Sequence, residues 1–214
     1  MGRIIFTRPE RKCRGNNLSP VMRFVFISGC LVVLAAIVFW NAARWLVVDA
    51  PARSDVILIL DGSIDGHFAR GLGLFQGSYG KQIVVTENVD ERVFGRTRAD
   101  LANQFIRDTM ANLANRIDVC PTRGDLPESV VQVTRCIPNV GVQRILFVTS
   151  DYKTRRTLSI FNRLLPQYHW SVAAAEDPSQ FGYEWWKHRQ WAKHMVVEWN
   201  DLLWWNCLER WQKP

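Results

Sequence analysis

The sequence predicts an α/β fold: a Rossmann-like, doubly wound, mostly parallel sheet of about five strands, preceded by one transmembrane helix and followed by a Trp-rich C-terminal helix. Three observations predict it. Short runs of consecutive apolar residues alternate with stretches that carry apolar residues at helical spacing, a pattern typical of strands buried on both faces by crossover helices. A long uncharged segment lies near the N-terminus, and seven of the ten tryptophans lie between Gly182 and Trp211.

The positive charge of the chain is concentrated at its start. The formal net charge is +7 over 214 residues, but the first 23 residues alone hold six basic side chains and one acidic side chain. The rest of the chain carries 21 basic and 19 acidic side chains, which is close to neutral. A basic surface for DNA or RNA is therefore not predicted. We expect residues 1–23 to form a short, mostly disordered cytoplasmic tail.

Residues 24–43 contain no charged side chain. At 1.5 Å per residue a helix of this length spans roughly 26–30 Å, which is enough to cross the core of a bilayer. Trp40 and Trp45 lie where an interfacial aromatic belt is expected, and Arg23 and Arg44 bracket the segment. We predict a transmembrane helix over residues 24–46, followed by a linker over residues 47–54.

Two kinds of processing compete with an uncleaved anchor. A cleavable signal peptide usually has a shorter apolar core and a shorter leader, and residues 50–52 are only a weak match to a cleavage site. Residues 27–30 resemble a lipoprotein box, but the apolar sequence before it is too short. We expect an uncleaved anchor, and the basic tail places the N-terminus in the cytoplasm and residues 46–214 outside.

The segment from 55 to 181 predicts one Rossmann-like domain. We expect strands at residues 55–60, 82–86, 116–119, 145–148 and 170–174, and helices at residues 67–79, 97–113, 128–137 and 153–165. A strand order of 3-2-1-4-5 would set the first and fourth strands side by side. The loops at residues 61–63 and 149–153 would then flank one crevice at the carboxyl ends of the strands.

The loop after the fourth strand has the chemistry of an anion site. Thr149 and Ser150 supply hydroxyls, and Lys153 and Arg156 supply positive charge at the start of the next helix. Such a corner suits a phosphate-like group. The alternative is a capped helix with a solvated basic turn.

With these elements placed, the chain resembles the YdcF/SanA/ElyC-like family, known as domain of unknown function 218. The resemblance covers about residues 50–175. Its motifs are Leu60-Asp61-Gly62-Ser63 with Arg70, then Thr86-Glu87-Asn88, and finally Val148-Thr149-Ser150-Asp151-Tyr152-Lys153-Thr154-Arg155-Arg156. The last block is the more specific one, and a single membrane anchor ahead of the domain is common in the family.

The resemblance implies a bacterial inner-membrane protein, with its domain in the periplasm, that takes part in cell-envelope biogenesis or barrier function. It implies these ligand-binding candidates: Asp61, Gly62, Ser63, Arg70, Glu87, Asn88, Ser129, Thr149, Ser150, Lys153 and Arg156. We expect Asp61, Arg70, Ser150, Lys153 and Arg156 to converge on one pocket.

Three departures from the family pattern bear on activity. Asp61 and Ser63 stand where the family usually has glycines, Lys153 stands where it often has His, and Gln132 stands where a Glu is usual. A lysine with a pKa near 10.4 does not replace a histidine that exchanges protons near pH 7. Anion binding survives these substitutions better than acid–base catalysis does.

Two functions from different classes follow. The first is an envelope enzyme, or its relic, that acts on a phosphorylated or lipid-linked precursor of the cell wall. The second is a non-catalytic binding or scaffold module at the membrane. A third, a nucleotide or S-adenosylmethionine binder, depends only on the analogy with Rossmann-like folds.

No cofactor and no metal site are expected, because the four histidines are scattered and His188 and His194 are badly spaced for one helix face. Neither a P-loop nor a nucleophile elbow is present. Ser63 and Ser150 are therefore interpreted as binding or capping hydroxyls.

Cys120 and Cys136 are expected to be free thiols. A helix of about ten residues between them would separate them by roughly 15 Å, too far for a disulfide. Cys207 has no evident partner.

The C-terminal segment, residues 182–214, predicts one long helix or two. One interpretation packs the tryptophan rings on the flank of the sheet. The alternative is an interfacial helix that touches the membrane, because tryptophan rings favour that zone.

Overall fold

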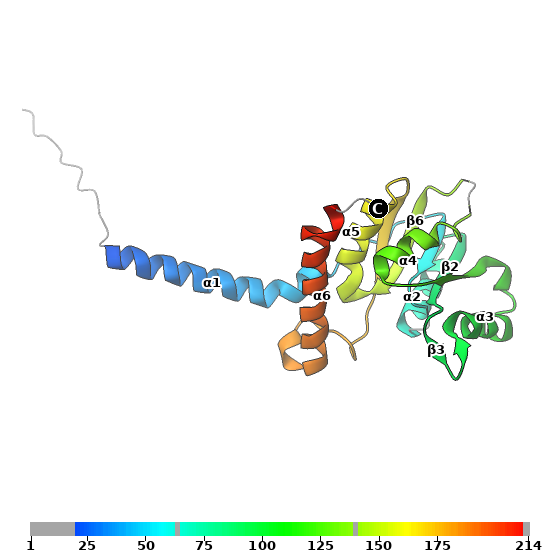
Figure 1. Cartoon of the computed structure of the whole chain (residues 1–214), viewed down its shortest axis with the longest axis horizontal. Helices are drawn as coiled ribbons and strands as arrows, with labels where there is room; N and C mark the ends of the chain where they lie inside the picture. Colours follow the sequence, from blue (N-terminus) through cyan, green and yellow to red (C-terminus); the bar gives the residue numbers. More distant parts are fainter. Residues whose placement is uncertain (1–19, 63–64, 139–140, 212–214) are drawn as a thin grey trace, which may run out of the picture. The chain divides into compact units, whose positions relative to one another are not determined.

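The computed structural model describes residues 20–62, 65–138 and 141–211. Five parallel strands form one sheet in the order β5-β2-β1-β6-β7 (Figure 1). Numbered along the chain within this sheet, the order is 3-2-1-4-5, which is the order considered above. The strands are β1 (Val56–Ile59), β2 (Gln82–Asn88), β5 (Ile117–Thr122), β6 (Arg144–Ser150) and β7 (His169–Ala175). The predicted fold class is confirmed, although most strands extend beyond their apolar runs into the polar residues that follow.

Helices connect the strands, as their apolar spacing predicted. The α-helices are α1 (Pro20–Leu46), α2 (Asp65–Gln76), α3 (Arg98–Thr109), α4 (Leu126–Val133), α5 (Thr154–Leu164) and α6 (Arg189–Cys207). Short 3-10 turns occur at η1 (Ala114–Arg116), η2 (Asp151–Lys153), η3 (Trp185–Lys187) and η4 (Glu209–Trp211). Side-chain caps explain two of the helix starts: Thr97 accepts a bond from the N–H of Asp100, and Asp125 accepts one from the N–H of Glu128.

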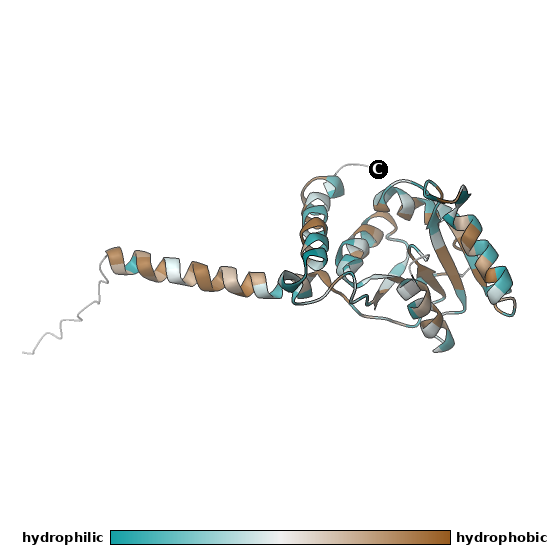
Figure 2. Ribbon diagram, turned by 90° about the horizontal axis from the view of Figure 1, so that it is seen from below, coloured by the Kyte–Doolittle hydropathy of each residue, from teal (hydrophilic) through white to brown (hydrophobic). Residues whose placement is uncertain are grey.

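The sheet is buried on both faces, which accounts for its continuous apolar strands. On one face Leu58 and Phe147 pack with residues of α4, α5 and α6, among them Phe161 and Trp205. On the other face Ile59 and Val148 pack with α2 and α3. Figure 2 shows the strands as mostly hydrophobic ribbons enclosed by helices of mixed character. Helices on both faces define the doubly wound arrangement.

The chain divides after Trp40 into two compact units. The first unit contains most of α1, whose segment from Val21 to Leu46 is long and apolar enough to cross a membrane. Its length and composition fit a membrane anchor or a signal sequence. The predicted tail over residues 1–23 falls outside the described residues except for its last four, which belong to α1.

The second unit begins with the last six residues of α1, from Asn41 to Leu46. Ala43 and Leu46 are completely buried and pack with Met195 and Leu202 of α6. The ring N–H of Trp199, also in α6, donates to the carbonyl of Ala42 at 3.1 Å. The end of α1 is therefore part of the folded core of this unit.

The segment predicted as a linker, residues 47–54, is bonded to the domain over most of its length. The N–H of Val48 donates to the hydroxyl of Thr154, and the N–H of Ala50 donates to the carbonyl of Val172 in the edge strand β7. Asp49 accepts a bond from the N–H of Ala174. The segment covers the open edge of the sheet and is not a free tether.

The prediction for Cys120 and Cys136 was wrong, because the two form a disulfide with their Cα atoms 5.7 Å apart. Strand β5 continues to Thr122, so Cys120 lies inside the strand and not at its end. Helix α4 has eight residues, a length of about 12 Å, and leads the chain back along the strand to the level of Cys120. Among the described cysteines, Cys30 and Cys207 are free.

A short hairpin between β2 and α3 was not predicted. Its strands, β3 (Arg92–Val93) and β4 (Arg96–Thr97), pair on either side of Phe94 and Gly95. These two turn residues have φ angles of 49° and 81°, as a type I′ turn requires. Phe is an uncommon residue at a positive φ, so this turn is hard to recognise from the sequence.

Candidate functional site

A polar cleft of about 340 Å³ lies at the carboxyl ends of β1, β2, β5 and β6. Asp61, Asn88, Ser129, Thr149, Lys153 and Arg156 are the predicted residues that line it. This edge of the sheet is where open α/β folds bind ligands, at the point where the strand order reverses. The crevice predicted between residues 61–63 and 149–153 is present, with Asp61 and Lys153 in the same cleft.

Strand geometry separates the other candidates from the cleft. Side chains alternate between the two faces of a strand, so consecutive residues of a motif point in opposite directions. Asn88 lines the cleft, whereas Glu87 and Gly62 line a different cavity on the α2/α3 face. Thr149 lines the cleft, whereas Ser150 is buried beside α2.

Arg70 does not reach the cleft. It is half exposed on α2, and its guanidinium lies 3.9 Å from the carboxylate of Asp49. Of the five residues expected to converge, the cleft therefore brings together three: Asp61, Lys153 and Arg156. Ser63 lies outside the described residues.

Arg156 is held by two acidic side chains of α6. Its Nε and one terminal nitrogen donate to Glu198 at 2.7 and 3.0 Å, and Asp201 lies 3.3 Å away. Burial raises the pKa of Glu198, and the hydrogen bonds and charge of Arg156 oppose that rise. The guanidinium is thus occupied within the protein, so the sequence-based assignment of Arg156 to an anion clamp is not supported.

Lys153 is the cation of the cleft that remains available. Its ammonium group forms no ion pair with any described residue and lies 5.8 Å from the centre of the Tyr152 ring. Next to it, Thr157 in the first turn of α5 is fully buried, and its hydroxyl has no hydrogen-bond partner among the described residues. A buried hydroxyl without a partner costs free energy, so this pair of groups is suited to an incoming acceptor.

Three of the four carboxylates that line the cleft are also bonded within the protein. Glu91 is bonded to Arg98 at 2.6 Å, Asp125 caps α4, and Asp201 is paired with Arg156. Asp61 has no ion pair among the described residues, and its φ of 48° lies in the left-handed region that favours glycine. Its side chain adds a carboxylate to the cleft.

Ser150 and His67 form a buried pair that sequence reasoning missed. The Nδ1 atom of His67 lies 2.6 Å from the carbonyl oxygen of Leu60, and Nε2 lies 2.9 Å from the Ser150 hydroxyl. A carbonyl can only accept, so Nδ1 carries the hydrogen and Nε2 accepts from Ser150. Burial lowers the pKa of His67, which favours this neutral form. The pair joins the corner after β6 to α2 and lies outside the cleft.

Comparisons with known proteins do not assign a family. A scan against protein-family models finds no match for the chain, and neither does a search of the curated proteins. Among the described residues, no group of three or more His, Cys, Asp or Glu side chains is arranged to hold a metal ion.

Proposed function

We propose that this chain is a membrane-anchored, extracytoplasmic protein that binds a phosphorylated envelope precursor in the polar cleft. The observation that carries the proposal is the position of Lys153 beside the unpartnered hydroxyl of Thr157, at the carboxyl edge of the sheet. An ammonium group and a hydroxyl donor suit the oxygens of a phosphate group. Asp61 and Asn88, in the same cleft, suit the hydroxyls of an attached sugar.

Binding is favoured over catalysis in this proposal. The YdcF/SanA/ElyC-like pattern often has a proton-exchanging His at the position of Lys153. A lysine there supplies a compact positive charge with three hydrogen-bond donors, which suits the binding of an anion. A binding or scaffold role is therefore the stronger of the two alternatives.

The extracytoplasmic location is supported by the disulfide between Cys120 and Cys136. Disulfides persist in oxidising compartments such as the periplasm and are rare in the cytosol. The basic residues ahead of α1 favour the same orientation, with the N-terminus inside.

An uncleaved anchor is supported by the end of α1. Cleavage near residues 50–52 would remove Ala43 and Leu46 from the core and would free the edge of β7. Each of these side chains is completely buried, so their loss would leave apolar surface of α6 exposed to water. We infer that α1 stays attached to the domain.

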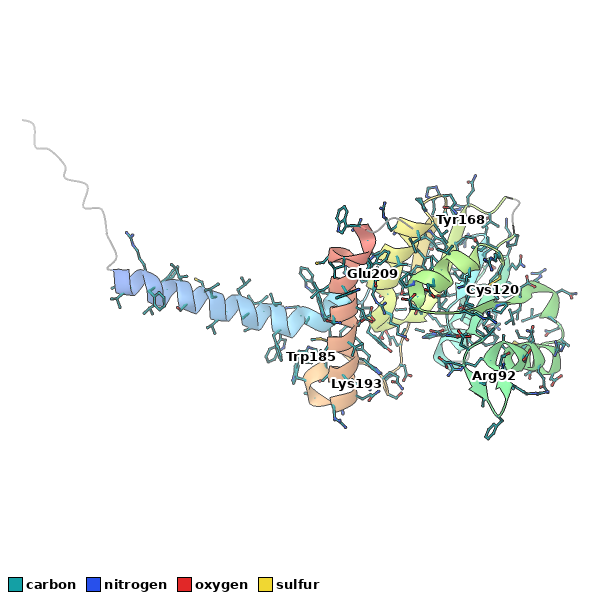
Figure 3. The ribbon with its side chains drawn as sticks, in the orientation of Figure 1. Arg92, Cys120, Tyr168, Trp185, Lys193 and Glu209 are labelled. Atoms are coloured by element: carbon teal, nitrogen blue, oxygen red, sulfur yellow. A yellow bond between two sulfur atoms is a disulfide. The ribbon has the colours of Figure 1, made fainter. Side chains whose placement is uncertain are left out.

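The outer face of α6 supports contact with the membrane surface. This face carries Val196, Leu203, Trp204, Leu208 and, just beyond the helix, Trp211, all of them about half exposed or more. The opposite face packs on the domain through Met195, Leu202 and Trp205, so α6 is apolar on two sides. In Figure 3, Trp185 and Lys193 mark one end of the helix and Glu209 marks the other. Tryptophan-rich faces of this kind favour the interfacial zone of a bilayer.

The test of the proposed function is a binding titration on the full chain in lipid nanodiscs. Glucose 1-phosphate and inorganic phosphate serve as probes for wild type, Lys153→Ala and Lys81→Ala. A charge-assisted bond is worth roughly 1.5–3 kcal/mol, so Lys153→Ala should weaken binding by about tenfold or more. Lys81 is an exposed lysine outside the cleft, and its replacement should leave affinity unchanged. Equal affinity in all three proteins would contradict the proposal.

A further inference from the structure

A second polar cavity, of about 770 Å³, lies at the amino ends of the strands, at the other end of the sheet from the polar cleft. We call it the amino-edge pocket. Four of the residues that line it are basic and one is acidic: Arg53, Lys81, Arg116, Arg144 and Asp55. The rest of the lining is Ser54, Phe75, Ser78 and Gly80.

These charges gather because parallel strands start side by side. Arg144 is the first residue of β6, whereas Asp55, Lys81 and Arg116 directly precede β1, β2 and β5. The backbone of Asp55 is bonded to both of its neighbours, since its N–H donates to the carbonyl of Arg144 and its carbonyl accepts from the N–H of Lys81. Four adjacent strands thus each bring a charged residue to this edge of the sheet.

Among the described residues that line the pocket, Asp55 is the one acid. Its Oδ2 atom accepts from the backbone N–H groups of Arg144 and Gln143, both at 3.1 Å, and its Oδ1 atom lies 3.9 Å from the ammonium group of Lys81. The two backbone hydrogen bonds lower the pKa of Asp55, so its carboxylate stays ionised near neutral pH. One carboxylate balances one cation, and Lys81 takes that place.

Arg53, Arg116 and Arg144 are therefore left without a counter-charge in the pocket. All three are exposed, and none of them forms an ion pair with a described residue. Asp118, two positions after Arg116, accepts from the side-chain amide of Gln82 and does not line the pocket. Like charges that share one cavity repel each other, so a bound anion would stabilise this arrangement.

The arginines determine which anion fits. A guanidinium group donates two parallel hydrogen bonds to a phosphate group and stays charged at physiological pH. Arg116 and Arg144 stand at the starts of β5 and β6, which are three strand spacings apart, or roughly 14 Å. Their side chains thus approach the pocket from two sides. A single phosphate group meets only part of this set, whereas two linked phosphate groups offer acceptors to both sides.

We propose that the amino-edge pocket binds a small molecule with two or more phosphate groups, such as a diphosphate. Arg116 and Arg144 hold the phosphate groups from opposite ends, Arg53 adds a third positive charge, and Phe75 supplies apolar surface for the uncharged part of the ligand. The site is separate from the proposed function, because the two cavities lie at opposite ends of the strands and share no lining residue.

The test titrates pyrophosphate and inorganic phosphate into the full chain in nanodiscs of zwitterionic lipid, followed by calorimetry. Every protein carries Lys153→Ala, which weakens any binding in the polar cleft. On this background Arg116→Gln/Arg144→Gln is compared with Arg107→Gln/Arg135→Gln. The control removes two exposed arginines that do not line the pocket, so the net charge of the two variants is equal.

On the Lys153→Ala background, pyrophosphate should bind at least tenfold more tightly than inorganic phosphate. Arg116→Gln/Arg144→Gln should weaken pyrophosphate binding by tenfold or more, because charge-assisted hydrogen bonds to the ligand are lost. Arg107→Gln/Arg135→Gln should leave the affinity unchanged. Added salt should weaken binding, since exposed charges are screened.

Two results would overturn the proposal. The first is equal affinity for pyrophosphate in the two double variants. The second is an affinity for pyrophosphate that does not exceed the affinity for inorganic phosphate. Both results leave the polar cleft untouched, because the test of that cleft depends on Lys153 and on ligands with one phosphate group.

Discussion

Arg156 of α5 and Glu198 of α6 form a two-point ion pair, with nitrogen–oxygen distances of 2.7 and 3.0 Å, inside the domain. The side chain of Glu198 is 3% exposed. The pair fixes α6 against α5, and α6 in turn holds the end of α1. In the fold this pair joins α5 to α6, whereas the sequence motif suggested ligand binding.

The first prediction concerns this pair. Arg156→Ala leaves Glu198 buried and unpaired, and breaking a buried ion pair from one side costs about 3–5 kcal/mol of unfolding free energy. We expect a large drop in the thermal midpoint of the full chain in detergent, followed by circular dichroism. Arg107→Ala, an exposed arginine on α3, is the matched control and should change stability by less than about 0.5 kcal/mol. Similar midpoints for both variants would show that the ion pair contributes little.

The second prediction concerns pH. Burial raises the pKa of Asp151 to about 6, from 3.8. Between pH 4 and pH 6 the Asp151 carboxyl is more protonated in the folded protein than in the unfolded chain. The free energy of unfolding should therefore fall as the pH rises from about 4 to 6. The full effect, present above pH 6, is about 3 kcal/mol at most.

Asp151→Asn removes this titration and keeps an oxygen that can accept the N–H of Tyr152. The variant should be more stable than wild type at pH 7.5, and the difference should shrink toward pH 4. Unfolding curves of both proteins at the two pH values give the comparison. A difference that does not change with pH would exclude Asp151 as the titrating group.

The third prediction concerns the disulfide. It closes a loop between residues 16 positions apart, and a loop of about 15 residues contributes roughly 3 kcal/mol. The double variant Cys120→Ala/Cys136→Ala should unfold at a lower temperature than wild type, and a reducing agent should lower only the wild-type midpoint. Cys207→Ala controls for the loss of an exposed thiol. If the reducing agent leaves the wild-type midpoint unchanged, the bridge is not formed in the protein.

The fourth prediction concerns the anchor. If α1 stays attached, the mature protein should keep its N-terminal segment, as an intact mass from the membrane fraction can show. A variant that starts at residue 51 should lose stability, because Ala43 and Leu46 leave the core and Ala174 loses the carboxylate of Asp49. A mature protein that begins near residue 51 and unfolds at the same temperature would contradict both statements.

The arrangement of the sheet could be predicted from the sequence because buried strands have a strong and local signal. The run from Ile145 to Val148 has no polar residue, whereas the strand order was only assumed, because doubly wound sheets occur in more than one order. The position of the polar cleft at the carboxyl edge could be expected because parallel strands place their carboxyl ends together. It was harder to predict which residues of that edge share a cavity. A difference of one position along a strand moves a side chain to the other face of the sheet.

The contacts of α6 could not be predicted. Nothing in the local sequence of Arg156 indicates that its partners are Glu198 and Asp201, which lie more than 40 positions away. The pairing of Ser150 with His67 depends in the same way on two elements that meet only in the fold. The disulfide was missed because the distance between Cys120 and Cys136 depends on where β5 and α4 end. The ends of strands and helices are the least certain part of a sequence-based prediction.

The burial of Ala43 and Leu46 has a consequence for how this protein would meet its ligands. The uncharged run ends at residue 43, and the folded domain already includes that residue, so the chain has no spacer between them. If α1 anchors the chain in a bilayer, the domain stays tethered to that same membrane. Its search for a membrane-borne ligand is then two-dimensional, and the effective concentration of that ligand is set by its density in the leaflet. A ligand dissolved in the surrounding water would gain nothing from this confinement.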